Sequence, residues 1–114
     1  MADVKDDRAF FRLEYPPREQ PTITIDRVKY SVRDLSEGGV RFATPLGTPL
    51  RVGDQVDASI TFRRDQHTID VEGLVIRLIP YPPQCALKLT KRIPRLRMAE
   101  EQRYINRLIM NKRQ

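Results

Sequence analysis

The feature that most constrains this chain is the alternation of apolar and polar residues that recurs between Thr22 and Leu89. A period of two places successive side chains on opposite faces of a strand, so each alternating segment predicts a strand with one buried face. About six such segments follow one another, separated by short turn signals. This spacing favours an antiparallel barrel or sandwich over a parallel sheet, and closure into a barrel would remove exposed strand edges.

The turn signals divide the chain into these strands. Asp26-Arg27 predicts a tight hairpin, DLSEGG a turn before the strand GVRFATP, and Gly53-Asp54 a turn before the alternation at Val56, Ala58, Ile60 and Phe62. RRDQH predicts a polar loop, and TIDVEGLVIRLI a long strand with Gly73 as a bulge. A proline-rich loop, PYPPQ, precedes a last short strand at CALKL.

Both ends of the chain differ from this pattern. Residues 1–20 show no usable period, and Pro16 and Pro17 stop any helix at Tyr15, which predicts a flexible N-terminal arm. Beyond Pro94, good helix formers predict a helix over about 95–112, with an apolar face at Leu96, Ala99, Ile105, Leu108 and Ile109. Glu100 and Glu101 lie early in it, where the helix dipole favours acidic residues. At 114 residues, the chain is expected to form one mainly β domain, residues 21–114, as a six-stranded antiparallel barrel.

Composition excludes several classes of protein. One cysteine, Cys85, and one histidine, His67, leave no internal disulfide and no zinc site built from these residues, so we expect no metal and a reducing, cytoplasmic location. No run approaches the roughly 18 apolar residues of a membrane span, and the acidic start is not a signal peptide. The net charge of +6 attracts phosphates without choosing among nucleic acid, nucleotide and acidic protein.

The arm contains RAFFR, with Arg8 and Arg12 four residues apart. Each guanidinium is a planar fork of donors that can clamp a phosphate, pair with O6 and N7 of guanine, or stack on a base. The alternative is two solvated arginines in a disordered tail.

In DLSEGG, Asp34 and Ser36 are residues that bond nearby backbone amides, while Gly38 and Gly39 permit positive φ and close approach of a ligand. The Asp34 carboxylate can accept hydrogen bonds from N1–H and the N2 amino group of guanine. The alternative is an ordinary hairpin turn.

Taken together, RxxxR in an arm, a strand hairpin and then DxSxxG resemble the PilZ domain family, the bacterial receptors for cyclic di-GMP. The strands GVRF and GLVIR and the terminal helix extend the resemblance over nearly the whole chain. It implies a cyclic di-GMP site at Arg8, Arg12, Asp34, Ser36 and Gly39, with the arm wrapping over the ligand. Gly38, Arg33 and Arg77 are additional candidates near this site. Arginine before RxxxR accompanies two stacked ligands in the family, and Asp7 stands there in this chain, so we expect one ligand.

No catalytic group emerges, and we expect no enzyme and no cofactor. Ser36 is not in a G-x-S-x-G elbow, His67 has no partner at a useful spacing, and Cys85 fits a small buried residue. The basic run KRIPRLR is either a solvated linker or an extension of an anion-binding surface.

Three functions remain at this level. The first is a stand-alone cyclic di-GMP receptor that passes its signal to an effector protein when the arm becomes ordered. The second is a ligand-independent protein-interaction domain. The third is a small-barrel nucleic-acid binder, which the few strand aromatics at Tyr30, Phe42 and Phe62 disfavour.

Overall fold

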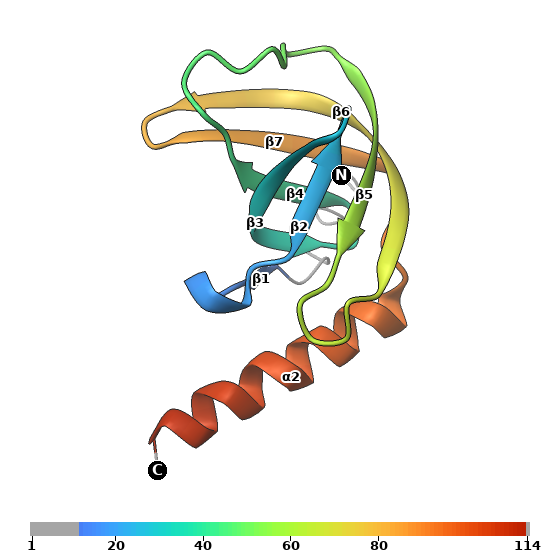
Figure 1. Ribbon diagram of the computed structural model, residues 1–114. Coiled ribbons are helices and arrows are strands. Elements are labelled where there is room, and N and C mark those ends of the chain that lie inside the picture. The colour runs from blue at the N-terminus through green and yellow to red at the C-terminus, as the bar shows by residue number, and fades with distance from the viewer. Residues whose placement is uncertain (1–11, 114) are drawn as a thin grey trace, which may run out of the picture.

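The computed structural model describes residues 12–113 and consists of strands followed by one long helix (Figure 1). The strands are β1 (Leu13–Glu14), β2 (Thr22–Ile25), β3 (Val28–Ser36), β4 (Gly39–Ala43), β5 (Gln55–Thr61), β6 (Thr68–Pro80) and β7 (Pro83–Lys91). A 3-10 turn, η1 (Pro17–Glu19), lies between β1 and β2, and the helix α2 (Arg95–Arg113) ends the described chain.

Six of the strands close into an antiparallel barrel, as predicted. They follow the order β3-β2-β5-β6-β7-β4, and the pairing of β3 with β4 closes the ring. β1 is an additional strand paired with the end of β3, through Leu13 with Leu35 and Glu14 with Asp34. Closure leaves no free edge among the six barrel strands, which removes the templates for pairing with other chains.

The interior of the barrel holds one apolar core. Its fully buried members include Phe42, Phe62, Ile23, Leu35 and Ile60. The predicted alternation in β5 is confirmed, because Ala58, Ile60 and Phe62 are buried and the residues between them are more exposed. In Figure 1, α2 lies under one end of the barrel, and the segment between β4 and β5 passes over the opposite end. Leu50 of that segment belongs to the core.

Most predicted turns are confirmed. Asp26 and Arg27 both have positive φ, at 50° and 70°, which is the conformation of a type I′ hairpin. The bulge predicted at Gly73 lies instead on the partner strand: Glu72 pairs with Lys91 and Gly73 with Leu89, so the extra residue is Thr90 of β7. A Cβ on Gly73 would lie 3.1 Å from the Lys88 carbonyl oxygen. PYPPQ is less of a loop than predicted, because β6 ends at Pro80 and β7 begins at Pro83.

The described part of the predicted arm packs on the barrel. Leu13 and Tyr15 are buried, and the Tyr15 amide donates to the Arg33 carbonyl over 3.0 Å. A two-residue strand is too short to produce a sequence period, so β1 was not predicted. Residues 1–11 lie outside the described residues, and the prediction of a flexible arm remains untested for them.

The buried face of α2 differs from the prediction. Leu96 and Ile109 are exposed, whereas Met98, Glu101 and Ile105 are buried at helical spacing, with Leu108 packed beside them. The predicted apolar face is therefore wrong at Leu96 and Ile109. Among residues 12–113, no helix has both the length and the apolar character needed to span a membrane.

Glu101 is the centre of a buried polar cluster that fixes α2 to the rest of the molecule. Its carboxylate is 1% exposed and accepts hydrogen bonds from the Tyr15 hydroxyl over 2.8 Å and from Nε of Arg64 over 3.2 Å. Arg97, one helical turn earlier, lies 3.5 Å from the same carboxylate and 4.9 Å from the centre of the Phe62 ring. The sequence indicates an ordinary charge near the helix start at Glu101, but the neighbours of its carboxylate make it a structural residue.

Replacing Tyr15 with phenylalanine tests this cluster. We expect the Tyr15→Phe protein to lose about 1–3 kcal/mol of unfolding free energy at neutral pH, because a buried Glu101 oxygen loses its donor. Burial, together with the Glu101 carboxylate, raises the pKa of Tyr15 above the ordinary value of 10.0. A raised pKa stabilises the folded state fully below pH 10, and this contribution falls as the pH rises further.

The stability difference between wild type and Tyr15→Phe should therefore narrow above pH 10, as measured by urea unfolding between pH 7 and pH 11. Tyr104, whose pKa is raised by its hydrogen bond to Glu19, is present in both proteins and cancels from the difference. A stability difference that stays constant over this range would contradict the assigned role of Tyr15.

Candidate functional site

The site depends on a β-bulge in β3, after which the side chains that point inward and outward exchange places. Val32 pairs with Phe42, but Asp34 pairs with Arg41, so Arg33 is an extra residue in β3 at this point. Val32 and Leu35 both lie in the core, three residues apart, and a strand with unbroken alternation does not allow this. The bulge at Arg33 therefore turns Asp34 and Ser36 to the outer face of the barrel.

The DxSxxG segment is consequently a strand end with a short turn. Asp34 and Ser36 belong to β3, and the turn itself is only Glu37-Gly38. This corrects the prediction that the whole of DLSEGG is a turn. The turn is fixed from outside, because the amides of Leu89 and Ile93 donate to the carbonyls of Gly38 and Glu37 over 2.9 Å and 3.0 Å.

Gly39 is required for space and not for a special φ. Among the described glycines, positive φ occurs at Gly47 and Gly53, so Gly38 and Gly39 do not adopt the positive φ that their residue type permits. A Cβ on Gly39 would lie 3.3 Å from the Leu87 carbonyl oxygen and 3.6 Å from Oγ of Ser36. Gly39 thus lets β4 approach β7 closely and leaves the Ser36 hydroxyl uncovered on that side.

Strand registers align the candidate residues in two rows on the outer face. The first row runs across β1, β3, β4, β7 and β6 as Glu14, Asp34, Arg41, Ala86 and Arg77. The second row contains Ser36, Gly39, Lys88 and Leu74. A second bulge, at Ile76, keeps Arg77 in the first row. Arg77 lies three strand spacings from Asp34, or roughly 14 Å.

Asp34 is on the outer face but is almost completely covered. It is 4% exposed, it lies between β1 and β4, and it forms an ion pair with Nη2 of Arg41. Its Oδ2 and the Nε of Arg41 are both buried without a hydrogen-bond partner of good geometry. Arg41 was not among the predicted site residues. The alternation in GVRFA, which places Arg41 on the face opposite Val40 and Phe42, carries the signal that identifies it.

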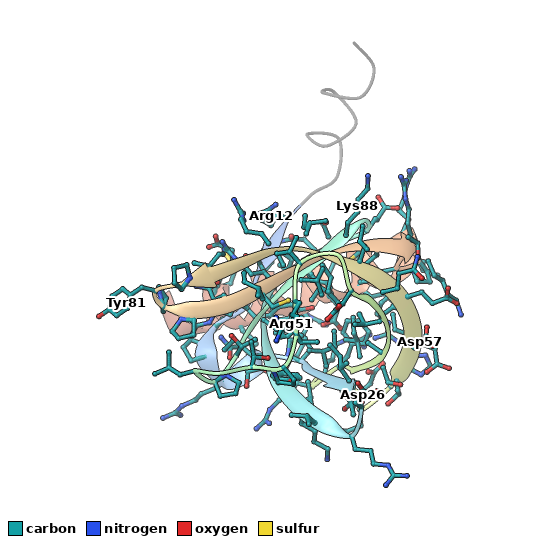
Figure 2. All side chains as sticks on the ribbon, turned by 90° about the horizontal axis from the view of Figure 1, so that it is seen from above. Arg12, Asp26, Arg51, Asp57, Tyr81 and Lys88 are labelled. Carbon is teal, nitrogen blue, oxygen red and sulfur yellow. The ribbon has the colours of Figure 1, made fainter. Side chains whose placement is uncertain are left out.

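Four more cations lie in or beside the two rows. Arg12, Arg33, Arg77 and Lys88 are exposed, and none of them forms an ion pair with another described residue. Arg12 lies directly before β1, next to Leu13, which pairs with Leu35. In the view from above, Arg12 and Lys88 extend from the same side of the barrel (Figure 2). Lys88, opposite Gly39, was also missed by the sequence analysis.

Arg8 and Asp7 lie outside the described residues, so the structure brings together Arg12, Asp34, Ser36 and Gly39 of the five main predicted residues. Of the additional candidates, Arg33 is the bulge residue itself, Gly38 is in the adjacent turn, and Arg77 is at the far end of the first row.

A hollow on another face of the barrel has more acidic than basic side chains in its lining, which does not favour an anionic ligand. It has a volume of about 460 Å³ and lies beside β2, β5 and β6. Its lining contains two cations, Arg27 and Lys91, and four carboxylates, those of Asp26, Asp57, Asp70 and Glu72. Asp26 and Asp57 lie away from Arg12 and Lys88 in Figure 2. Within residues 12–113, no group of histidine, cysteine and carboxylate side chains is arranged to hold a metal ion.

Comparisons with known proteins agree with this architecture. The solved structure of the Bacillus subtilis inhibitor of motility, MotI/DgrA, superposes with a TM-score of 0.62 and 19% identity, over 92% of this chain and 52% of that one. Escherichia coli YcgR, solved in complex with c-di-GMP, superposes with a TM-score of 0.60 and 17% identity, over 91% and 46%. This chain therefore spans about half the length of each. No curated protein gives a significant match.

The sequence itself provides the assignment to a family. The family model described as "PilZ domain" matches residues 6–110, which include both predicted motifs and nearly the whole described fold. The protein belongs to the PilZ domain family.

Proposed function

We propose that this protein is a receptor for cyclic di-GMP and that it transmits ligand binding to an effector protein. The observation that carries the proposal is the outer face around Asp34, where a covered carboxylate and a hydroxyl share a face with exposed cations that have no ion pair within residues 12–113. The structure of YcgR, a protein of the same fold, was solved with this ligand. In the proposal, the protein acts in the cytoplasm, has no catalytic activity and needs no cofactor.

The chemistry of the face matches the two parts of the ligand. Guanine presents N1–H and an N2 amino group as adjacent donors, and a carboxylate such as that of Asp34 has two oxygens to accept them. Two phosphates require cations, which Arg8 and Arg12 provide in the arm. Arginine suits this role because its forked donors can bind one phosphate through two hydrogen bonds. Ser36 and Gly39 supply a hydroxyl and the space beside it.

Lys88, Arg33 and Arg77 extend the cationic face beyond the two motifs. Lys88 is the cross-strand partner of Gly39, and Gly39 is in turn the partner of Ser36, which carries the hydroxyl. An exposed ammonium acts on a phosphate as a point charge whose attraction is screened by salt. We assign these three residues to attraction and orientation of the ligand, and Asp34 to reading the base.

A physical route for the signal leads from the arm to α2. Arg12 is three residues before Tyr15, whose hydroxyl is bonded to Glu101 of α2. Further along, Oε1 of Glu19 accepts a hydrogen bond from the Tyr104 hydroxyl of α2 over 2.7 Å. A ligand that holds Arg12 and β1 therefore acts on a segment attached to the helix at two points. We propose that α2 is the element that the effector senses.

Two other functions are weighed against this one. Proteins that bind single-stranded nucleic acid commonly stack bases on aromatic side chains of the barrel surface, whereas the strand aromatics Tyr30, Phe42 and Phe62 are buried and the exposed Tyr81 lies in the turn between β6 and β7. A ligand-independent interaction domain would not need Asp34, Ser36, Gly39 and Arg12 brought together on one face. We therefore place both below the receptor.

Calorimetric titration of cyclic di-GMP into the full chain tests the proposal. We expect micromolar or tighter binding with one ligand per chain. The Arg8→Ala/Arg12→Ala variant should lose at least about a hundredfold in affinity, because two charge-assisted contacts to phosphate are removed. Arg51→Ala/Arg63→Ala is the matched control, since it removes the same charge from two exposed arginines outside the two rows.

Two results would contradict the receptor. One is the absence of heat and of a thermal shift in the wild type. The other is an equal loss of affinity in the control variant, which would make the interaction a general effect of charge. Binding to oligonucleotides that weakens steeply with salt, without binding of cyclic di-GMP, would favour the nucleic-acid function.

Hydrogen exchange tests the route to α2. We expect saturating cyclic di-GMP to slow amide exchange in α2 of the wild type, and Tyr15→Phe to reduce this effect while ligand still binds. Tyr30→Phe, a change of the same chemistry in a core residue of β3, should leave the effect intact. Binding that leaves exchange in α2 unchanged in the wild type would exclude the helix as the output element and leave the receptor standing.

A further inference from the structure

We propose that Arg41 is the positioning residue of the ligand site: it holds the Asp34 carboxylate in the orientation that reads the guanine edge, and it does not itself bind the phosphates. This inference rests on the proposed function, because it assigns a role within the same site. It concerns a residue of β4 that belongs to neither motif of the sequence.

The Asp34 carboxylate is nearly buried and has one cation in contact with it among the described residues. The side chain is 6% exposed and lies on the outer face between β1 and β4. Within residues 12–113, the cation in contact with its carboxylate is Arg41, and no described side chain or amide donates a well-aligned hydrogen bond to Oδ2. A carboxylate that is covered in this way needs a cation to offset its desolvation and to hold its orientation.

The register of β3 against β4 brings Asp34 and Arg41 together. Asp34 and Arg41 are cross-strand partners on β3 and β4, immediately after the bulge at Arg33. Directly opposed side chains in an antiparallel pair are the closest neighbours that a sheet provides. The bulge therefore turns Asp34 outward and also sets it opposite its cation.

Arg41 differs from the other cations of the face in its burial and in its ion pair. Its side chain is 31% exposed, and its Nε is buried without an acceptor. Arg12, Arg33, Arg77 and Lys88 are exposed and have no ion pair with a described residue. A phosphate meets these free cations without breaking an existing pair, whereas capture by Arg41 would remove the cation from Asp34.

The Asp34 carboxylate keeps free hydrogen-bond acceptor sites beside Arg41. A carboxylate offers about four lone-pair sites, and Arg41 contacts one oxygen, Oδ2. Sites remain for the two adjacent donors of guanine. Arg41 and the base thus share Asp34 from different directions, and loss of Arg41 releases the carboxylate to turn toward solvent or toward Arg33.

The experiment compares cyclic di-GMP with cyclic di-IMP, which lacks the N2 amino groups and keeps both phosphates. The wild type should prefer cyclic di-GMP by about ten- to a hundredfold, the value of a hydrogen bond to a charged group. Arg41→Met, which keeps most of the side-chain length, should bring this preference close to one, mainly by weakening cyclic di-GMP. Lys88→Met is the matched cation control, and it should weaken both ligands equally and reduce the salt dependence of binding.

A double-mutant cycle with Asp34→Asn distinguishes positioning from direct contact. If Arg41 acts through Asp34, Arg41→Met should have little further effect on cyclic di-GMP affinity in the Asp34→Asn protein. Arg41→Lys, which keeps a cation beside the carboxylate, should restore part of the preference. Arg41→Gln, which keeps a donor without the charge, takes the place of Arg41→Met in the cycle if the methionine variant does not fold.

The outcomes separate this inference from the proposed function. If Arg41→Met weakens both ligands equally, or adds its full effect in the Asp34→Asn protein, Arg41 is a phosphate ligand and the positioning role is wrong. An unchanged preference in Arg41→Met also overturns it. If the wild type binds neither cyclic dinucleotide, the proposed function fails first.

Discussion

The change of facing at Arg33 is the constraint on which the site depends. Without the extra residue, Val32 and Asp34 would share the inner face, and a carboxylate would enter a core that contains Phe42, Phe62 and Ile60. An unpaired charge in such a core costs far more free energy than the local loss of one ladder pairing. The barrel therefore keeps its apolar interior by inserting a bulge, and the same bulge displays Asp34 beside Arg41. A second bulge, at Ile76, has the same effect on Arg77, at the other end of the row.

The Glu101 cluster attaches both the segment around Tyr15 and the helix α2 to the barrel. A buried carboxylate is stable only with its partners in place, and here those partners come from the N-terminal segment, from the loop after β5 and from α2 itself. Removing one partner of a buried pair typically costs about 3–5 kcal/mol, because the other charge stays behind. Such a cluster resists small adjustments. The root of the arm and the helix therefore change position together or not at all, which is the property that a relay from ligand to helix requires.

The sequence predicted the strands well and the site incompletely, for identifiable reasons. Alternation reports which face of a strand is buried, so β2 to β7 and the barrel were predictable. A bulge depends on the register between strands distant in sequence, so the row from Asp34 through Arg41 to Arg77 was not. Glu101 resembled a solvated acid near a helix start, because its partners, Tyr15 and Arg64, are remote in sequence. The motif residues were found by their resemblance to a family, and Arg41 and Lys88 required the pairing of β4 with its neighbours.

The distribution of charge shows why reading the base and attracting the ligand belong to different residues. The net charge is +6, and the hollow beside β2 and β5 is lined by four carboxylates and two cations, whereas Arg12 and Lys88 lie on another face. The exposed cations around the two rows attract a dianion before contact. This attraction does not distinguish one nucleotide base from another. Discrimination requires an acceptor with a fixed direction, and an outward-facing carboxylate has a fixed direction only if a cation is held in register with it. Arg41, opposite Asp34 and partly buried, is the cation that meets this condition.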